Sequence, residues 1–86
     1  KLHYHDADIT DVRVAKSSPA AGQTLKELDL RRKYGVSVLL IQRASQTIVN
    51  PGRDDRLEPD DQAVLLGSPE LIAGVSWIFF DPEKED

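Results

Sequence analysis

The sequence predicts an α+β domain, with a small mixed β-sheet that includes a β-hairpin and two or three short helices packed on it. Three observations support this class. Residues 36–42 and 62–67 are apolar runs of strand length. A tight polar connection at 43–46 joins the first run to another strand. Residues that favour helix N-termini stand at Thr24 and Ser68.

The first strand is expected at Ile9–Ala15. Val12 and Val14 alternate with charged residues there, which is typical of a strand with one buried face. Residues 1–8 are polar and without a clear period, so we expect a linker or disordered entry. The domain itself is expected over 9–80, followed by an acidic tail at 81–86.

The following helix is expected to be short and broken. Thr24 and Glu27 have the spacing of a capping box, in which each side chain bonds an unpaired amide at the helix start. Leu30 falls out of phase with the two leucines before it. We therefore expect Asp29 to cap a second helical turn, and Gly35 to supply the left-handed stop.

Three strands are expected after the broken helix. Val36–Gln42 alternates little, which predicts a strand covered on both faces. Pro51 ends the next strand, Thr47–Asn50, because proline cannot donate to a ladder. A charged loop at Arg53–Asp61 then leads to a buried strand at Gln62–Gly67.

The last helix begins at Ser68, with Pro69 at its first position. At 100° per residue, one face of this helix is predicted to join the core; it comprises Leu71, Ile72, Val75, Ile78 and Phe79. Trp77 and Phe80 fall outside that face, which favours a partner interface. In the alternative, the helix ends early and both rings fold back onto the sheet.

Composition limits the function classes. The 86 residues form one domain at most, no cysteine is available for disulfides or thiolate metal sites, and no apolar run has membrane-spanning length. A net charge of −4 argues against binding of nucleic acid. Because the chain begins at Lys1 rather than methionine, we expect it to be a piece of a longer protein.

Several short motifs occur in a characteristic order, namely Gly22-x-x-Leu25-x-x-Leu28-x-Leu30, Tyr34-Gly35-Val36, Gln42-Arg43, Asn50-Pro51, Leu57-x-x-x-Asp61 and Gly67 before a final helix. In this order and spacing the chain resembles the C-terminal domain of regulators of potassium conductance, the TrkA-C or RCK_C family. The resemblance covers roughly residues 9–80. One departure is Ser45, where the family often has glycine, and this leaves the turn type open.

The resemblance implies a cytoplasmic regulatory domain of a potassium or other cation transporter, channel or antiporter. It implies a homodimer joined to membrane segments of the same or an associated chain, with no cofactor and no enzymatic activity. Some members of the family bind cyclic di-AMP at the dimer interface, and others bind a divalent cation or have no known ligand. The alternative is a ligand-free structural module that dimerises a transporter.

The resemblance also implies a set of ligand-binding residues. It maps a cyclic di-AMP pocket onto Ile41, Arg43, Ile48, Asn50 and Pro51. An arginine can bind a phosphate with two parallel hydrogen bonds, and an asparagine can recognise an adenine edge. In the alternative, Arg43 is an exposed turn residue and Asn50 only caps the segment before the proline.

Two further clusters could bind a metal ion. The charged loop holds five carboxylates, Asp54, Asp55, Glu58, Asp60 and Asp61, but it lacks the residue order of a calcium loop. We expect it to be solvated, with Asp61 shaping the turn into the next strand. The second cluster is His3, His5, Asp6 and Asp8, which we expect to be solvated as well. We therefore predict no metal site.

Bond-making chemistry finds no support in the sequence. Neither histidine has a serine or cysteine partner in a recognisable catalytic order. The glycines form neither a dinucleotide-binding fingerprint nor a P-loop. A small hydrolase or metal enzyme is therefore disfavoured.

Overall fold

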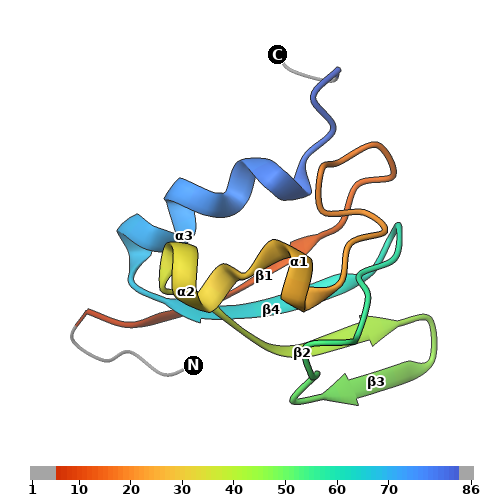
Figure 1. Ribbon diagram of the computed structural model, residues 1–86, viewed down its shortest axis with the longest axis horizontal. Helices are drawn as coiled ribbons and strands as arrows, with labels where there is room; N and C mark the ends of the chain where they lie inside the picture. The colour runs from red at the N-terminus through yellow and green to blue at the C-terminus, as the bar shows by residue number, and fades with distance from the viewer. Residues whose placement is uncertain (1–5, 84–86) are drawn as a thin grey trace.

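The computed structural model describes residues 6–83. Its elements, in chain order, are β1 (Asp8–Arg13), α1 (Leu25–Leu28), α2 (Leu30–Tyr34), β2 (Ser37–Arg43), β3 (Gln46–Val49), β4 (Gln62–Gly67), α3 (Pro69–Val75) and the 3-10 helix η1 (Ser76–Phe79). The strands form one sheet in the order β1-β4-β2-β3. The helices lie together over one face of this sheet (Figure 1). This arrangement confirms the predicted α+β class.

Every strand pairing is antiparallel, so the sheet differs from the mixed sheet that was expected. β4 lies between β1 and β2 and runs against both. In β2 the register shifts between Val38 and Leu40, which marks a β-bulge. The turn of the β2–β3 hairpin places Ala44 in the left-handed region with φ 52°.

The expectation that residues 36–42 are covered on both faces is wrong for the chain alone. Within β2 only Ile41 is fully buried. Val49 on β3 is 71% exposed and Ile9 on β1 is 45% exposed. All helices lie on one side of the sheet, so among residues 6–83 no second layer covers the other side (Figure 1).

The core lies between the sheet and the helices. Its fully buried large side chains come from β2, β4, α3, η1 and the connecting loops, and include Phe79, Ile41, Leu57, Leu65, Val14, Val36 and Val75. No helix in the described part of the chain is long and apolar enough to cross a membrane.

The broken helix forms as predicted, except at its break. Both bonds of the capping box are present: Glu27 N–H donates to Thr24 Oγ1 at 3.1 Å, and Thr24 N–H donates to Glu27 Oε1 at 2.8 Å. Asp29, however, does not cap the second turn. Its backbone is left-handed, with φ 52°, and its side chain accepts from Arg32 Nε at 2.6 Å. Gly35 ends α2 with φ 69°, as expected.

The last helix changes period along its length, because α3 ends at Val75 and continues as η1. Ser68 caps α3 by accepting from Leu71 N–H at 3.1 Å, which confirms the predicted start. Four of the five predicted core residues are buried, namely Ile72, Val75, Ile78 and Phe79. Leu71 was wrongly assigned to the core: it is 45% exposed and lies over Gly35, where α2 meets α3.

Replacing Gly35 by alanine should destabilise the domain. At φ 69° an L-residue costs about 1–2 kcal/mol, and the added Cβ would lie 3.0 Å from Leu71 Cδ1. Gly74→Ala is the matched control, because Gly74 is helical and a Cβ there meets nothing within 4 Å. We expect that control to raise stability by up to about 1 kcal/mol. Urea unfolding measures both, and equal effects of the two variants would contradict this reading.

Candidate functional site

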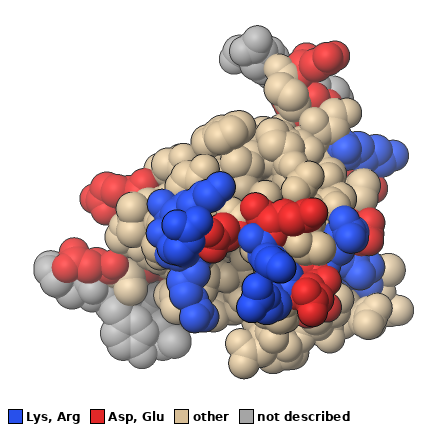
Figure 2. Space-filling view, viewed as in Figure 1, with Lys and Arg blue, Asp and Glu red and all other residues tan. Residues whose placement is uncertain are grey.

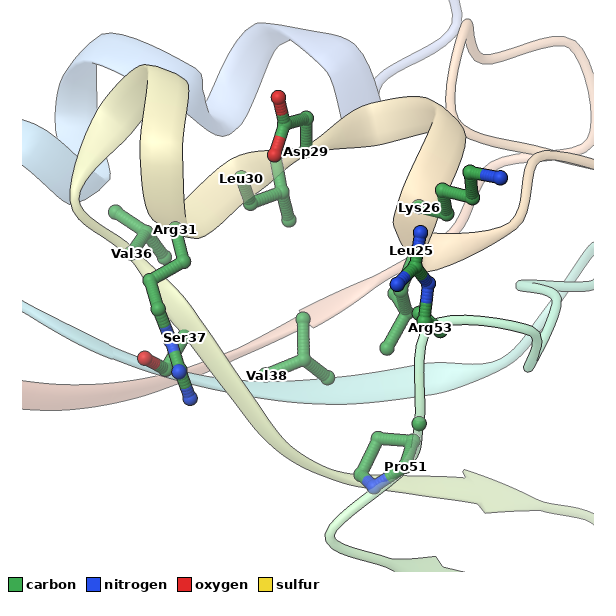
Figure 3. Close-up of a pocket in the computed structure, with 11 residues that line it drawn as sticks. Leu25, Lys26, Asp29, Leu30, Arg31, Val36, Ser37, Val38, Pro51 and Arg53 are labelled. Atoms are coloured by element: carbon green, nitrogen blue, oxygen red, sulfur yellow. The ribbon is translucent and has the colours of Figure 1, made fainter.

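An open groove of about 620 Å³ lies between the α1–α2 pair and the start of β2. The loop that follows β3 closes its lower side (Figure 3). The groove is lined by residues from three separate stretches of chain, namely Leu25, Lys26, Asp29, Leu30, Arg31, Val36, Ser37, Val38, Pro51, Gly52 and Arg53.

Two walls of the groove are bonded directly to each other. Leu25 N–H donates to Asp55 O and Lys26 N–H donates to Arg53 O, both at 2.9 Å. The first amides of a helix have no partner within the helix, so the loop carbonyls supply one. The bonds therefore fix the loop relative to α1, and with it the width of this end of the groove.

The groove combines apolar side chains with positive charge that no carboxylate of residues 6–83 pairs with. Lys26 and Arg53 lie at one end and Arg31 at the other, with Leu30 and Val38 between them (Figure 3). Among residues 6–83, the ion pairs that form use other arginines, namely Arg13, Arg32 and Arg43. The single carboxylate of the lining, that of Asp29, is paired with Arg32.

The charge distribution on this side of the molecule agrees with that description. Lys and Arg side chains gather over α1, α2 and the neighbouring loop, with carboxylates between them (Figure 2). Unpaired cations around an apolar floor suit a ligand that has both anionic and flat apolar parts. Such a surface therefore offers binding chemistry.

An ion pair between a buried carboxylate and a half-buried guanidinium lies outside the groove. Arg43 donates from Nε to Asp61 Oδ1 at 2.9 Å and from Nη2 to Asp61 Oδ2 at 2.8 Å. The same Nη2 donates to Arg56 O at 2.8 Å, and Glu58 N–H donates to Asp61 Oδ2 at 2.8 Å. The Asp61 side chain is 1% exposed and that of Arg43 is 33% exposed.

The ion pair shifts the pKa of both groups. Burial alone would raise the pKa of Asp61, but the hydrogen bonds from Arg43 and Glu58 and the Arg43 charge outweigh it and hold the pKa below its usual range. The hydrogen bond to Asp61 raises the pKa of Arg43. Both groups are therefore charged at neutral pH.

The structure separates the five residues expected to bind cyclic di-AMP. Pro51 lines the groove, and Asn50 beside it is exposed, with φ 55° and its N–H donating to Leu39 O at 2.8 Å. Ile48 is half-buried against the core. Ile41 is fully buried in the core, and Arg43 is held by Asp61, so neither lines the groove.

The sequence did not predict that Lys26, Arg31 and Arg53 line one groove. They come from segments far apart in the sequence, so no local motif joins them. The available signal was weak: Arg53 follows the Asn50-Pro51 motif by two residues, and the other two lie within the broken helix. Reasoning also missed the pairing of Arg43 with Asp61, although both end motifs of the resemblance.

The remaining predicted sites are the exposed aromatic pair and the two clusters of potential metal ligands. Trp77 is 58% exposed and Phe80 is 55% exposed, so the alternative in which both rings fold back onto the sheet is wrong. In the acidic loop, Asp60 pairs with Arg13 at 2.6 Å, and Asp55 accepts from Gly52 N–H at 2.6 Å. Three or more potential metal ligands come together nowhere in residues 6–83, and His3 and His5 lie outside that range.

Known proteins share this sequence pattern. The family model of the TrkA-C domain matches residues 9–76. The Ktr system potassium uptake protein C of Bacillus subtilis is 35% identical over 57 residues, and the K(+)/H(+) antiporter subunit KhtT of the same organism is 35% identical over 68 residues. The matches cover 66% and 78% of this chain but 26% and 41% of those proteins. The chain thus spans less than half the length of either relative.

Solved structures share the fold. The RCK C domain of the potassium transport protein KtrA, in complex with cyclic di-AMP, has a TM-score of 0.72 at 25% identity, covering 80% of this chain and 79% of that one. The RCK_C domain dimer of S. agalactiae BusR with c-di-AMP gives 0.75 at 22%, covering 83% and 93%. BusR with its busAB-promotor DNA gives 0.78 at 21%, covering 99% and 41%. The two BusR likenesses, at such low identity, show the fold alone.

Proposed function

Since the chain belongs to the TrkA-C domain family, we propose that it is the ligand-sensing regulatory domain of a potassium or other cation transport protein. In this proposal it works at the cytoplasmic side of the membrane, as a homodimer, and catalyses no reaction. The similarity to a potassium uptake protein and to an antiporter subunit supports a role in cation transport. We keep the prediction that this domain binds no nucleic acid, because its net charge is −4. BusR is seen with promotor DNA, but its likeness to this chain, at 21% identity, shows the fold alone.

The proposed ligand is cyclic di-AMP, and the groove is the observation that carries this choice. Cyclic di-AMP has two phosphates and two adenines, so it needs both cations and apolar surface. The groove supplies three cations that form no ion pair within residues 6–83, and they lie beside apolar side chains. The KtrA C domain, 25% identical, is seen with the same ligand. Because the ligand has two-fold symmetry, grooves from two copies related by a two-fold axis would match it.

Each residue has a specific role in this proposal. Arg53 and Lys26 bind a phosphate at one end of the groove, and Pro51 packs against an adenine. Asn50, exposed at the rim, recognises an adenine edge, and Ile48 supports the strand that carries it. Ile41 and Arg43 do not line the groove, so in this proposal they support the residues that do and make no contact with the ligand.

Regulation would follow from a population shift. A ligand that binds one dimer arrangement more tightly favours that arrangement by its difference in affinity alone. The exposed Trp77 and Phe80 are the proposed contact through which the change reaches a partner subunit or the attached transporter.

Calorimetric titration tests the ligand. We expect wild type to bind cyclic di-AMP with one ligand per two chains, and Arg53→Gln to weaken binding roughly tenfold through loss of a charge-assisted bond. Lys16→Gln is the charge-matched control, because Lys16 is exposed and does not line the groove. Absence of binding by wild type would contradict the proposal. Dimerisation without any nucleotide binding would instead favour the structural module.

A further inference from the structure

We infer that Arg43 and Asp61 form a positioning pair for the groove: they hold its loop wall in place without contacting the ligand. The wall in question is residues 51–57, called the groove loop below, which carries Pro51, Gly52 and Arg53 into the lining. The inference rests on the proposed function, since it assigns these two residues a role in the same ligand site.

The pair is built as a junction between three segments. Arg43 ends β2, Asp61 directly precedes β4, and Arg56 belongs to the groove loop. One guanidinium group bonds to both other segments, through Asp61 Oδ1 and Oδ2 and through Arg56 O. Asp61 also accepts from Glu58 N–H, just after the groove loop. With an exposed fraction of 1%, the Asp61 side chain has no room for a ligand.

Backbone bonds carry this anchoring on to the groove. Leu57 N–H donates to Gln23 O at 2.9 Å, and Gly22 N–H donates to Leu57 O at 2.7 Å. These bonds place the end of the groove loop against the chain just before α1. The same loop gives its Arg53 carbonyl to Lys26 N–H. The two cations at this end of the groove therefore take their spacing from a loop that Arg43 and Asp61 anchor.

The positioning role and a phosphate contact in which the ligand takes Arg43 away from Asp61 predict opposite results for Asp61→Asn. In the second case the Asp61 carboxylate competes with the ligand for the same guanidinium donors, and its removal would tighten binding. If the pair only positions the loop, the same change loosens the wall and weakens binding. Asparagine keeps the size of the side chain and one oxygen acceptor, so the variant is a mild test.

Asp60→Asn is the matched control. It makes the same change of charge one residue away, but Asp60 is 49% exposed and pairs with an exposed Arg13. Asparagine also tolerates the left-handed backbone found at Asp60, where φ is 73°. In calorimetry with cyclic di-AMP we expect Asp61→Asn to lose roughly tenfold in affinity and Asp60→Asn to stay within about twofold of wild type. Unchanged or tighter binding by Asp61→Asn would overturn the inference.

Hydrogen exchange of the unliganded protein tests the positioning without the ligand. In Asp61→Asn we expect the amides of Leu25 and Lys26, which bond the groove loop, to exchange roughly tenfold faster relative to the β4 amides. Asp60→Asn should leave that ratio unchanged. Acceleration spread evenly over sheet and helix would show a merely structural role and overturn the inference. If wild type binds no cyclic di-AMP, the proposed function fails, and this measurement alone decides the positioning role.

Discussion

Replacing Phe79 by alanine should lower the free energy of unfolding by about 3–5 kcal/mol. Phe79 is fully buried, and it is the last residue of η1. A small domain has a total stability of about 5–15 kcal/mol, so this one change should bring the protein close to the unfolding threshold. Urea unfolding followed by circular dichroism measures the loss.

Phe80→Ala is the matched control for Phe79→Ala. Phe80 is the same residue type one position later, but it is 55% exposed. We expect its replacement to change stability by no more than about 0.5 kcal/mol. Because Phe79 O also accepts from Ala15 N–H at 3.0 Å, the backbone of η1 holds the end of the chain to the β1–α1 connection in both variants. Similar losses in the two variants would contradict the burial pattern.

Replacing Asp61 by alanine should cost about 2–3 kcal/mol at neutral pH. The change removes the acceptors of Arg43 Nε and of Glu58 N–H, and it leaves a partly buried guanidinium unpaired. Arg13→Ala is the control, because it breaks the exposed pair with Asp60 and should cost at most about 1 kcal/mol. Chemical unfolding at pH 7 compares the two, and equal costs would contradict a structural role for the buried pair.

The cost of Asp61→Ala should depend on pH. The pKa of Asp61 is lowered in the folded protein, so the carboxylate stabilises the fold above its unfolded pKa, about 3.9. That stabilisation is lost as the pH falls through the lowered folded pKa. The difference between wild type and Asp61→Ala should therefore be full at pH 7 and smaller at pH 3. A difference that stays constant over this range would show that the charge of Asp61 is not what stabilises the fold.

Local features of the fold could be predicted from the sequence because their causes lie within a few residues. The Thr24–Glu27 capping box, the stop at Gly35 and the cap at Ser68 all form as expected. The role of Asp29 could not be predicted, because its carboxylate could either cap the second helical turn or bind Arg32. With the left-handed backbone at Asp29, the carboxylate binds Arg32. Leu71 was misassigned because the period of 100° per residue treats the whole segment as one α-helix. The hydrophobic pattern does not reveal the change from α to 3-10 geometry after Val75.

The candidate site depends on contacts between distant segments, and this limits what the sequence could predict. The family resemblance led to Pro51, which lines the groove, and to its exposed neighbour Asn50. It also pointed to Arg43, but the partner that decides the role of Arg43 is 18 residues away. The cations of the groove are brought together only when the loop after β3 bonds to α1.

The most direct test of a nucleotide-sensing groove is amide chemical-shift mapping of the isotope-labelled domain during titration with cyclic di-AMP. We expect saturable shifts concentrated at the groove-lining residues Lys26, Arg31, Val38, Gly52 and Arg53. The amides of the acidic Asp54–Asp55 turn serve as neighbours that should shift less. Adenosine, which lacks the phosphates, should bind more weakly. No shifts at saturating ligand, or shifts centred away from the groove, would contradict the account.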